Sequence, residues 1–191
     1  MRNLKYAILG LVNREPMTGY DIKKAFDSRG LTNFWHAEHS QIYPEMKKLV
    51  AEGLVEYETV IRGEKLETKL YRITPAGKKD FHDWLRDDVE IERTYKDVFR
   101  LRTFFNESLS QEEYLKLLRS QLMQHRQKRD MLRFYLETDF STLPRFKTKQ
   151  MGDYLVLDGA VRRETTYVEW LEHCIDVFEN GTPGEPVDLI E

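Results

Sequence analysis

The stretch HSQIYPEMKKLVAEGLVE, residues 39–56, predicts an amphipathic helix with a proline close to its start. Four apolar residues recur at the i, i+4, i+7, i+8 spacing of a buried helical face: Ile42, Met46, Leu49 and Val50. Gly53 is suited to end this helix, and Pro44 is tolerated only near its beginning, since a proline inside a helix costs about 3 kcal/mol. We therefore expect the helix to begin near Ser40 and to end near Glu52, with a polar and aromatic first turn.

The segments on either side predict the other elements of a winged helix-turn-helix. A first short helix is indicated by apolar residues at helical spacing: Leu4, Ala7, Ile8 and Leu11. Thr18 can cap a second helix, and the alternating pattern of residues 55–73 predicts a β-hairpin with a charged tip. Thr74 followed by Pro75 marks the start of a fourth helix. The buried side of that helix would carry Phe81, Trp84 and Leu85.

The second half of the chain predicts long helices. One helix is expected around residues 98–105, and Ser110 with Glu113 forms a capping box for another that runs to about Thr138. A last helix shows the three-and-four spacing of a coiled coil, with one polar member: Tyr154, Leu157, Val161, Glu164, Val168, Leu171, Ile175 and Phe178. Such a seam needs a partner, which is either the first domain or a second chain. We expect a dimer interface built on Leu157, Val161, Val168, Leu171 and Ile175.

Together these patterns predict a mainly α fold with two domains. Residues 1–90 would form an N-terminal winged helix-turn-helix with a two-stranded β wing, which is a DNA-binding domain. Residues 91–180 would form a C-terminal dimerisation domain of long helices, followed by a flexible tail at residues 181–191.

The composition excludes some classes of protein. The chain has 191 residues, of which 40% are hydrophobic and 33% charged, and its net charge is −3. No apolar run approaches the ~20 residues of a membrane span. The single cysteine, Cys174, excludes an internal disulfide and suits a reducing cytoplasm, where we expect the protein to act. A mildly acidic chain can still bind nucleic acid, because the electric field that matters is local.

The helix that begins near Ser40 is the candidate DNA-recognition helix, because a helix-turn-helix places the first turn of its second helix in the major groove. Gln41 could pair with adenine through two hydrogen bonds, while Ser40 and Tyr43 offer hydroxyls to base edges or phosphates. Three further residues nearby are expected to contact DNA: Thr18, Tyr20 and Lys47. The alternative is that these are surface residues of a winged helix that binds protein.

The predicted wing adds cations. Lys65 at the tip is the preferred phosphate contact, and Lys69 on the returning strand is a second one. Four acidic residues share this hairpin: Glu56, Glu58, Glu64 and Glu67. A solvated surface of ion pairs is therefore the alternative interpretation of the wing.

Metal and catalytic sites are not expected. His36 and His39 could share a metal ion, but no cluster of His or Cys elsewhere supplies further ligands. The chain also lacks a phosphate-cradling glycine loop and the G-x-S-x-G, H-E-x-x-H and C-x-x-C motifs. We expect neither a cofactor nor an enzymatic activity.

Several motifs resemble the PadR family of bacterial transcriptional regulators. They are LKYAILGL, GYDI, W-x-x-x-HSQIYPEMKKL, the wing G-x-K-L-E-x-K-x-Y-x-x-T and the later GKKDFHDWL. The segment GDYLVLDGAVRRETTYVEWLE is similar to the last dimerisation helix of the family's phenolic acid decarboxylase repressors. The likeness covers nearly all of the chain except residues 141–149 and the tail. The wing departs from the commoner Arg-Pro-Arg-Lys-Tyr-Tyr-like pattern of the family, so the DNA contacts made by the wings of other members are less directly applicable to this chain.

The resemblance implies a homodimer that binds double-stranded operator DNA of pseudo-palindromic sequence and represses a phenolic acid decarboxylase gene. Phenolic acids such as p-coumaric or ferulic acid would release it. A regulator of a multidrug exporter, which binds varied flat aromatic compounds, is the alternative within the family. A dimeric scaffold that binds protein is the alternative from another class.

An effector pocket between the two domains is a further hypothesis. Aromatic rings would enclose the ring of the ligand, and a His or Arg side chain would meet its carboxylate. The candidates are Tyr6, Trp35, His36, His39, Tyr154 and Arg163.

Overall fold

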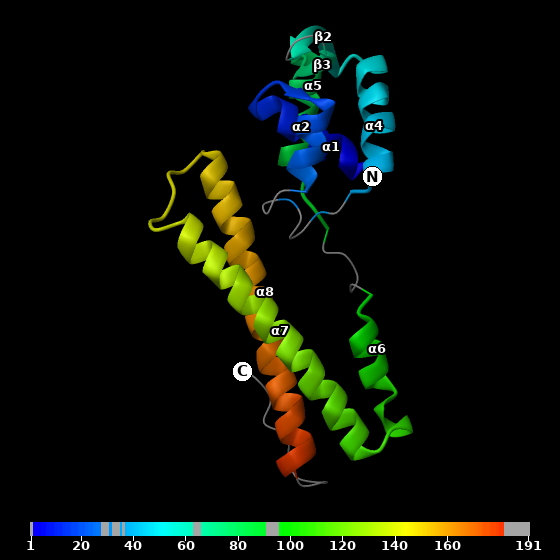
Figure 1. Ribbon diagram of the computed structural model, residues 1–191, viewed down its shortest axis with the longest axis vertical. Coiled ribbons are helices and arrows are strands. Elements are labelled where there is room, and N and C mark those ends of the chain that lie inside the picture. The colour runs from blue at the N-terminus through cyan, green and yellow to red at the C-terminus, as the bar shows by residue number, and fades with distance from the viewer. Residues whose placement is uncertain are drawn as a thin grey trace. The chain divides into compact units, whose positions relative to one another are not determined.

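The computed structural model shows a mainly helical chain (Figure 1). It describes residues 2–27, 31, 35, 37–62, 66–90 and 96–181. The chain divides into two compact units, residues 1–91 and 92–191. No helix in these described ranges is both long and apolar enough to cross a membrane.

The first unit is a winged helix-turn-helix. Its elements are α1 (Asn3–Arg14), β1 (Met17–Thr18), α2 (Gly19–Phe26), α4 (His39–Ala51), β2 (Val55–Arg62), β3 (Leu66–Ile73) and α5 (Pro75–Arg86). The sheet is antiparallel with the strand order β1-β3-β2, so the wing has a third, short strand that we did not predict. A strand of two residues is too short to show an alternation of apolar and polar side chains, so the sequence did not predict it. It forms because Met17 pairs with Tyr71 of β3.

The predicted helix boundaries depend on side-chain caps that the structure contains. The Thr18 hydroxyl accepts a hydrogen bond from the Asp21 amide at the start of α2, and Thr74 accepts one from the Gly77 amide at the start of α5. At the end of α4, Gly53 has a φ of +70°, and the Leu54 amide donates to the carbonyl of Leu49 at 3.0 Å. This is a Schellman motif, and it turns the chain into the wing.

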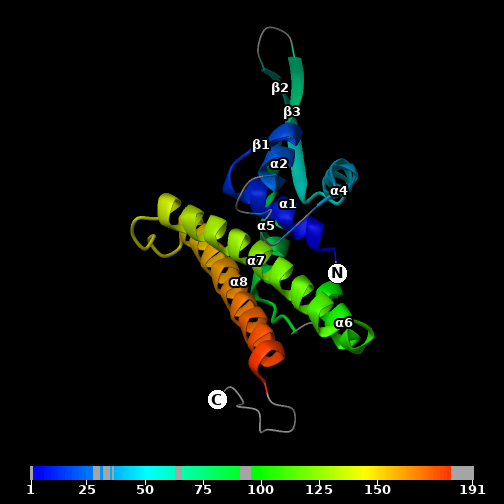
Figure 2. The same cartoon turned by 60° about the horizontal axis from the view of Figure 1, so that its bottom comes forward.

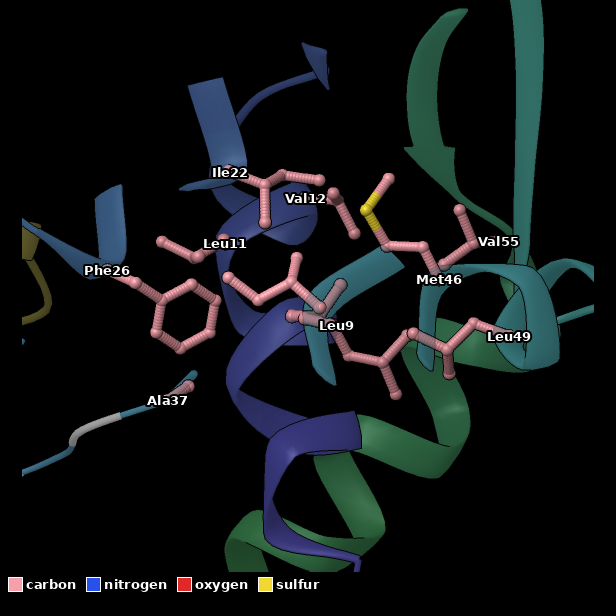
Figure 3. Close-up of a cluster of buried hydrophobic side chains, with 11 residues drawn as sticks. Leu9, Leu11, Val12, Ile22, Phe26, Ala37, Met46, Leu49 and Val55 are labelled. Carbon is pink, nitrogen blue, oxygen red and sulfur yellow. The ribbon is translucent and has the colours of Figure 1, made fainter. Parts of the chain in front are cut away.

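The core of the first unit lies where α1, α2, α4 and the base of the wing meet (Figure 3). It consists of Ile8, Leu9, Leu11, Val12, Ile22, Phe26, Ala37, Ile42, Met46, Leu49 and Val55. The apolar face predicted for α4 is therefore confirmed. The prediction for Leu85 is wrong, because its side chain is 57% exposed. The ring centroids of Trp84 and Tyr6 of α1 lie 4.5 Å apart, so Trp84 faces α1. Leu85 is the next residue of the helix and points about 100° away from this contact.

The second unit is built on a pair of long helices. Its elements are α6 (Val98–Phe104), a 3-10 turn (Asn106–Ser108), α7 (Gln111–Asp139) and α8 (Lys149–Asn180). Figures 1 and 2 show α7 and α8 lying side by side as an antiparallel hairpin. Ser110 and Glu113 form the predicted capping box of α7. Cys174 packs half-buried against one of the apolar clusters, and burial raises the pKa of its thiol.

The coiled-coil seam of α8 packs against α7 of the same chain. Val168 and Leu171 are buried with Tyr114, Leu118 and other residues of α7, and a second cluster further along the hairpin contains Leu132, Leu157, Ala160 and Val161. Ile175 packs half-buried against the first cluster. The seam thus has a partner within the same chain, and the dimer interface predicted on it stays a prediction. The five residues proposed for dimerisation are largely covered by α7, because an antiparallel helical hairpin already fills a seam of this length.

Candidate nucleic-acid interface

The start of α4 presents polar groups to solvent. The helix begins at His39, one residue earlier than expected, and Glu38 is its N-cap. Pro44 consequently lies in the second turn, where its missing N–H leaves the carbonyl of Ser40 without its backbone donor. Ser40 and Gln41 are both exposed. The side chain of His39 lies outside the described part of the chain.

Gln41 also has a structural role. Its side-chain oxygen accepts a hydrogen bond of 3.3 Å from the backbone N–H of Glu38, which completes a capping box. A bidentate contact with adenine needs both the oxygen and the amide nitrogen of the side chain. Gln41 must therefore release this long, exposed hydrogen bond before it can bind a base in the predicted way.

The N-terminus of α2 supports Tyr43 of α4. A Cβ atom on Gly19 would lie 2.9 Å from Cε1 of Tyr43, so only glycine allows the ring to sit this close. Tyr43 is 48% exposed, and Tyr20, which follows Gly19 on α2, is 65% exposed. Thr18, by contrast, is 1% exposed and its hydroxyl is bonded to Asp21. The prediction that Thr18 contacts DNA directly is therefore wrong, because its side chain is a buried helix cap.

The next turn of α4 carries cations. Lys47 and Lys48 are exposed, and neither forms an ion pair within the described ranges. The same helix is held to the N-terminus by Glu45, which is buried and bonded to Nη2 of Arg2 at 2.5 Å. Arg2 also bonds Glu52 at 2.6 Å, and these two partners raise the pKa of its guanidinium. The exposed face of α4 is thus free for a polyanion while its acidic residue is neutralised internally.

The strand register separates the charges of the wing onto two faces. Tyr57 is opposite Tyr71, and Thr59 is opposite Lys69, so these four side chains share one face. Glu56 and Glu58 lie on the other face, where Glu58 forms an ion pair of 2.7 Å with Arg72. Glu67 shares the face of Lys69. Glu64 and Lys65, the preferred phosphate contact, lie outside the described residues, so that prediction stays open.

The wing face that carries Lys69 also holds two tyrosines that we did not predict as functional. The ring centroids of Tyr57 and Tyr71 are 5.6 Å apart, and Nζ of Lys69 lies 3.9 Å from the centroid of Tyr57. The contact with Tyr57 raises the pKa of Lys69, and burial raises that of Tyr71. The alternation of residues 55–73 already contained this signal, because it assigns residues 57, 59, 69 and 71 to a common face.

The predicted effector residues belong to both units. Tyr6 stacks on Trp84, and Trp35 packs half-buried against the core, where its ring N–H has no hydrogen-bond partner in the described part of the chain. On α8, Tyr154 meets Phe140 edge-on at 5.6 Å, and Arg163 is exposed. His36 and the side chain of His39 lie outside the described residues. The effector hypothesis stays a prediction.

A cleft of about 520 Å³ in the second unit was not predicted. It is lined by Lys96, Asp97, Val98, Phe99, Arg102, Gln121, His125 and Tyr167. His125 stacks on Tyr167 at 4.0 Å, and the hydroxyl of Tyr167 donates to Asp97 at 2.8 Å. Cations and aromatic rings together suit a small aromatic anion, and the volume is that of an ordinary ligand site. Residues so far apart in sequence gave no signal for it.

Metal-binding groups do not gather in the described ranges, where no three His, Cys, Asp or Glu residues are placed to hold an ion. The buried carboxylate of Glu164 is instead bonded to Nδ1 of His125 and Nζ of Lys128, each at 2.7 Å. It is thus part of a protein ion pair.

Comparison with known proteins agrees with this geometry. Residues 8–83 match the "Transcriptional regulator PadR-like family" and residues 95–179 match "Virulence activator alpha C-term". The negative transcriptional regulator PadR of Bacillus subtilis is 43% identical over 94% of this chain and 99% of its own length. Its crystal structure in complex with operator DNA superposes with a TM-score of 0.89 at 43% identity, covering 93% of this chain and 100% of that one.

A second crystal structure of Bacillus subtilis PadR, in complex with p-coumaric acid, has a TM-score of 0.83. It is 40% identical and covers 94% of this chain and 100% of its own. Both halves of the chain, and the arrangement of the elements within them, are therefore shared with these regulators. The chain belongs to the PadR-like family of transcriptional regulators.

Proposed function

We propose that this protein is a cytoplasmic, homodimeric repressor of a phenolic acid decarboxylase gene. It binds a pseudo-palindromic operator and is released by phenolic acids such as p-coumaric or ferulic acid. The relative that is 43% identical over nearly the whole chain supports this proposal, because its solved structures include complexes with operator DNA and with p-coumaric acid.

The observation that carries the DNA-binding part is the exposed start of α4. Ser40, Gln41 and Tyr43 project from the first turns of the second helix of a helix-turn-helix, which is where base contacts are made. Lys47 follows one turn later and suits a phosphate. The opposite face of the helix is buried in the core, so its orientation is fixed.

The dimer is better supported by α6 than by the seam of α8. Four large apolar residues in or directly after α6 are more than half exposed: Val98, Leu101, Phe104 and Phe105. A single short helix that exposes this much apolar surface is typical of an interface. A two-fold axis would then place two copies of α4 in major-groove half-sites about one helical turn apart.

The effector shifts the population of dimers towards a form in which the two recognition helices do not fit these half-sites. The size of the shift is set by the difference in its affinity for the two forms. Trp35 is the predicted effector residue that we keep as the first to test, because its buried ring N–H lacks a partner among the described residues. This mechanism needs no turnover, and p-coumarate should be recovered chemically unchanged.

The test is a binding titration with a duplex that the protein itself selects from a random pool. We expect a dissociation constant of about 10⁻⁸ M or lower at physiological salt and marked weakening when p-coumarate is added. Failure to select any duplex would contradict the repressor, and selection without an effect of p-coumarate would contradict the induction step. Release by varied flat cations but not by phenolic acids would favour an exporter regulator.

Trp35→Ala and Arg102→Ala separate two effector sites. Loss of the p-coumarate response in the Trp35 variant alone supports the effector residues predicted from the sequence. Loss in the Arg102 variant alone supports the cleft beside α6. A response that both variants retain would contradict both sites.

A further inference from the structure

The cleft of the second unit lies between α6 and the α7–α8 hairpin, and all three helices contribute to its walls (Figure 1). Its volume is about 520 Å³. The two residues that α7 contributes, Gln121 and His125, are four apart and therefore share one face of that helix. None of the effector residues predicted from the sequence is part of the lining. The cleft is thus a separate site, built within the second unit alone.

One wall of the cleft is a hydrogen-bonded network that fixes its polar groups. Nδ1 of His125 donates to the buried carboxylate of Glu164 at 2.7 Å, and the ring of His125 stacks on Tyr167 at 4.0 Å. The hydroxyl of Tyr167 donates to Oδ2 of Asp97 at 2.8 Å. Nε2 of His125 has no hydrogen-bond partner among the described residues. The network therefore holds the imidazole in one orientation and leaves its second nitrogen for a ligand.

The charge of the cleft favours an anion. Lys96 and Arg102 line it and are exposed, and neither has an ion-pair partner in the part of the chain that the structure describes. Asp97 also lines it, but its Oδ1 accepts from the Arg100 amide at 3.0 Å and its Oδ2 from Tyr167. Burial would raise the pKa of this carboxyl group, yet these hydrogen bonds hold it below its usual value. Asp97 is thus satisfied within the protein, and two cations remain for a ligand.

The aromatic rings of the lining favour a flat ligand. Phe99 on α6 meets Trp170 edge-on at 6.3 Å, and Tyr167 on α8 meets the same indole edge-on at 5.1 Å. Trp170 therefore holds in place the two rings that line the cleft from different helices. Apolar rings combined with a few charged groups are typical of sites for small organic molecules. The ligand that matches both the rings and the cations is a small aromatic carboxylate.

The helix α6 depends on tertiary contacts, because it has seven residues and none of them is buried. Isolated helices of this length are not stable in water. The hydrogen bond from Tyr167 to Asp97 and the contact of Phe99 with Trp170 are two contacts that hold α6 on the hairpin. Val98 lines the cleft and is also one of the exposed apolar residues of α6. A ligand in the cleft would therefore touch the same helix that carries this apolar surface.

We propose that the cleft binds a small aromatic carboxylate as a regulatory ligand, which joins α6 to the α7–α8 hairpin. Arg102 and Lys96 bind the carboxylate, and the ring packs against Phe99 and Tyr167. Because the ligand contacts three helices at once, it opposes local unfolding of α6. Its effect on the dimer, whose interface we assign to α6, rests on the proposed function, whereas the binding site itself does not.

The probe is benzoate, and its matched control is benzamide, which has a similar shape but no charge. Binding to the full-length protein in the absence of DNA is followed by ligand-observed NMR. We expect benzoate to bind with a dissociation constant of about 1 mM or lower, as suits so small a ligand. Benzamide should bind about tenfold more weakly, because it cannot form a charge-assisted hydrogen bond with Arg102. Cyclohexanecarboxylate, which keeps the charge but lacks the aromatic ring, should bind severalfold more weakly than benzoate.

Two arginines of α6 provide a matched pair of variants. Arg102→Met should weaken the binding of benzoate about tenfold, the effect of losing a hydrogen bond between charged groups. Arg100→Met should leave the binding unchanged, because Arg100 is an exposed arginine of the same helix that is not part of the lining. Both side chains are exposed, so neither change should disturb folding.

Hydrogen exchange tests the link to α6. Benzoate at about ten times its dissociation constant should slow the exchange of the α6 amides about tenfold in the wild type. The same occupancy cannot be reached in Arg102→Met, where exchange should stay at the rate of the free protein. The amides of α2 in the first unit are the internal reference and should not change.

The inference is overturned if benzoate does not bind in the millimolar range, if benzamide binds equally well, or if Arg102→Met and Arg100→Met bind benzoate alike. Binding without slower exchange in α6 would overturn the proposal that the ligand joins this helix to the hairpin. Neither measurement contains DNA. Failure of this site is therefore distinct from failure of the proposed repressor, which would appear as the absence of any selected duplex.

Discussion

Tyr43 shows how the position of one exposed side chain is set by a residue that lacks one. Its ring occupies the space that a Cβ on Gly19 would need, with Cε1 at 2.9 Å from that point. Gly19 is the first residue of α2 and does not have a positive φ. Its requirement for glycine is therefore one of space, and it couples the start of α2 to the recognition helix.

Gly19→Ala should weaken DNA binding severalfold with little change in stability. The new methyl group forces the Tyr43 ring to move, while alanine favours a helix by up to about 1 kcal/mol relative to glycine. The measurement is a binding titration with thermal unfolding of the same sample. Gly159→Ala is the matched control, because a Cβ there meets nothing within 4 Å, and it should keep wild-type affinity. Wild-type affinity in Gly19→Ala would contradict the packing.

At the scale of elements, the α7–α8 hairpin contains one buried carboxylate. Glu164 is 4% exposed and is bonded to Lys128 and His125, both at 2.7 Å. Burial raises the pKa of this carboxyl group, but the two partners outweigh burial and the net pKa lies below its usual value. These two contacts join α8 to one part of α7, so they help to fix the register of the two helices.

Glu164→Gln should destabilise the protein by about 2 kcal/mol near neutral pH, because a buried amide replaces the carboxylate that accepts hydrogen bonds from Lys128 and His125. The pKa of Glu164 is lowered by folding, so the wild-type advantage is present above the unfolded value of about 4.5 and is lost as the pH falls through the folded pKa. Urea unfolding at about pH 7 and about pH 4 measures how far the difference in unfolding free energy between the wild type and Glu164→Gln falls in acid. Glu172→Gln breaks the exposed pair with Arg126 and should change stability by under about 1 kcal/mol at both pH values. A stability difference between the wild type and Glu164→Gln that is larger at about pH 4 than at about pH 7 would contradict the lowered pKa of Glu164.

The element scale also shows what could be predicted from the sequence. Caps at Thr18, Thr74 and Ser110 and the period of the apolar residues predicted the helices correctly, because these signals are local. The period of the α8 seam predicted which face is buried but not which helix covers it, since α7 and a second chain would impose the same pattern. The cleft beside α6 and the packing of Gly19 on Tyr43 depend on tertiary contacts, so no local pattern indicated them.

At the scale of the whole molecule, α6 packs Phe99 against Trp170 of α8 but leaves most of its other apolar side chains exposed. Phe104 is 75% exposed, and Leu101 and Phe105 are exposed beside it in sequence. Apolar surface of this kind, concentrated in one short segment, is expected to be covered in the functional assembly. An operator of two half-sites then couples dimerisation to DNA affinity, because each chain contributes one recognition helix.

Phe104→Glu should shift the protein from dimer to monomer, because the interface would have to bury an unpaired charge. The measurement is sedimentation equilibrium across a range of protein concentrations, with DNA affinity determined in parallel and expected to fall at least tenfold. Val89→Glu is the matched control, since Val89 is 80% exposed and lies just after α5. It should remain a dimer. A dimeric Phe104→Glu protein would place the interface elsewhere.

Binding of operator bases by the first turns of α4 underlies the proposed function. It is tested most directly by the affinity of Gln41→Ala and Tyr43→Ala for a duplex selected by the wild-type protein, with sedimentation confirming that each variant is still a dimer. We expect each change to cost about 1–3 kcal/mol of binding free energy, while Gln124→Ala on α7 costs nothing measurable. Unchanged affinity in both α4 variants, with the dimer intact, would contradict the account.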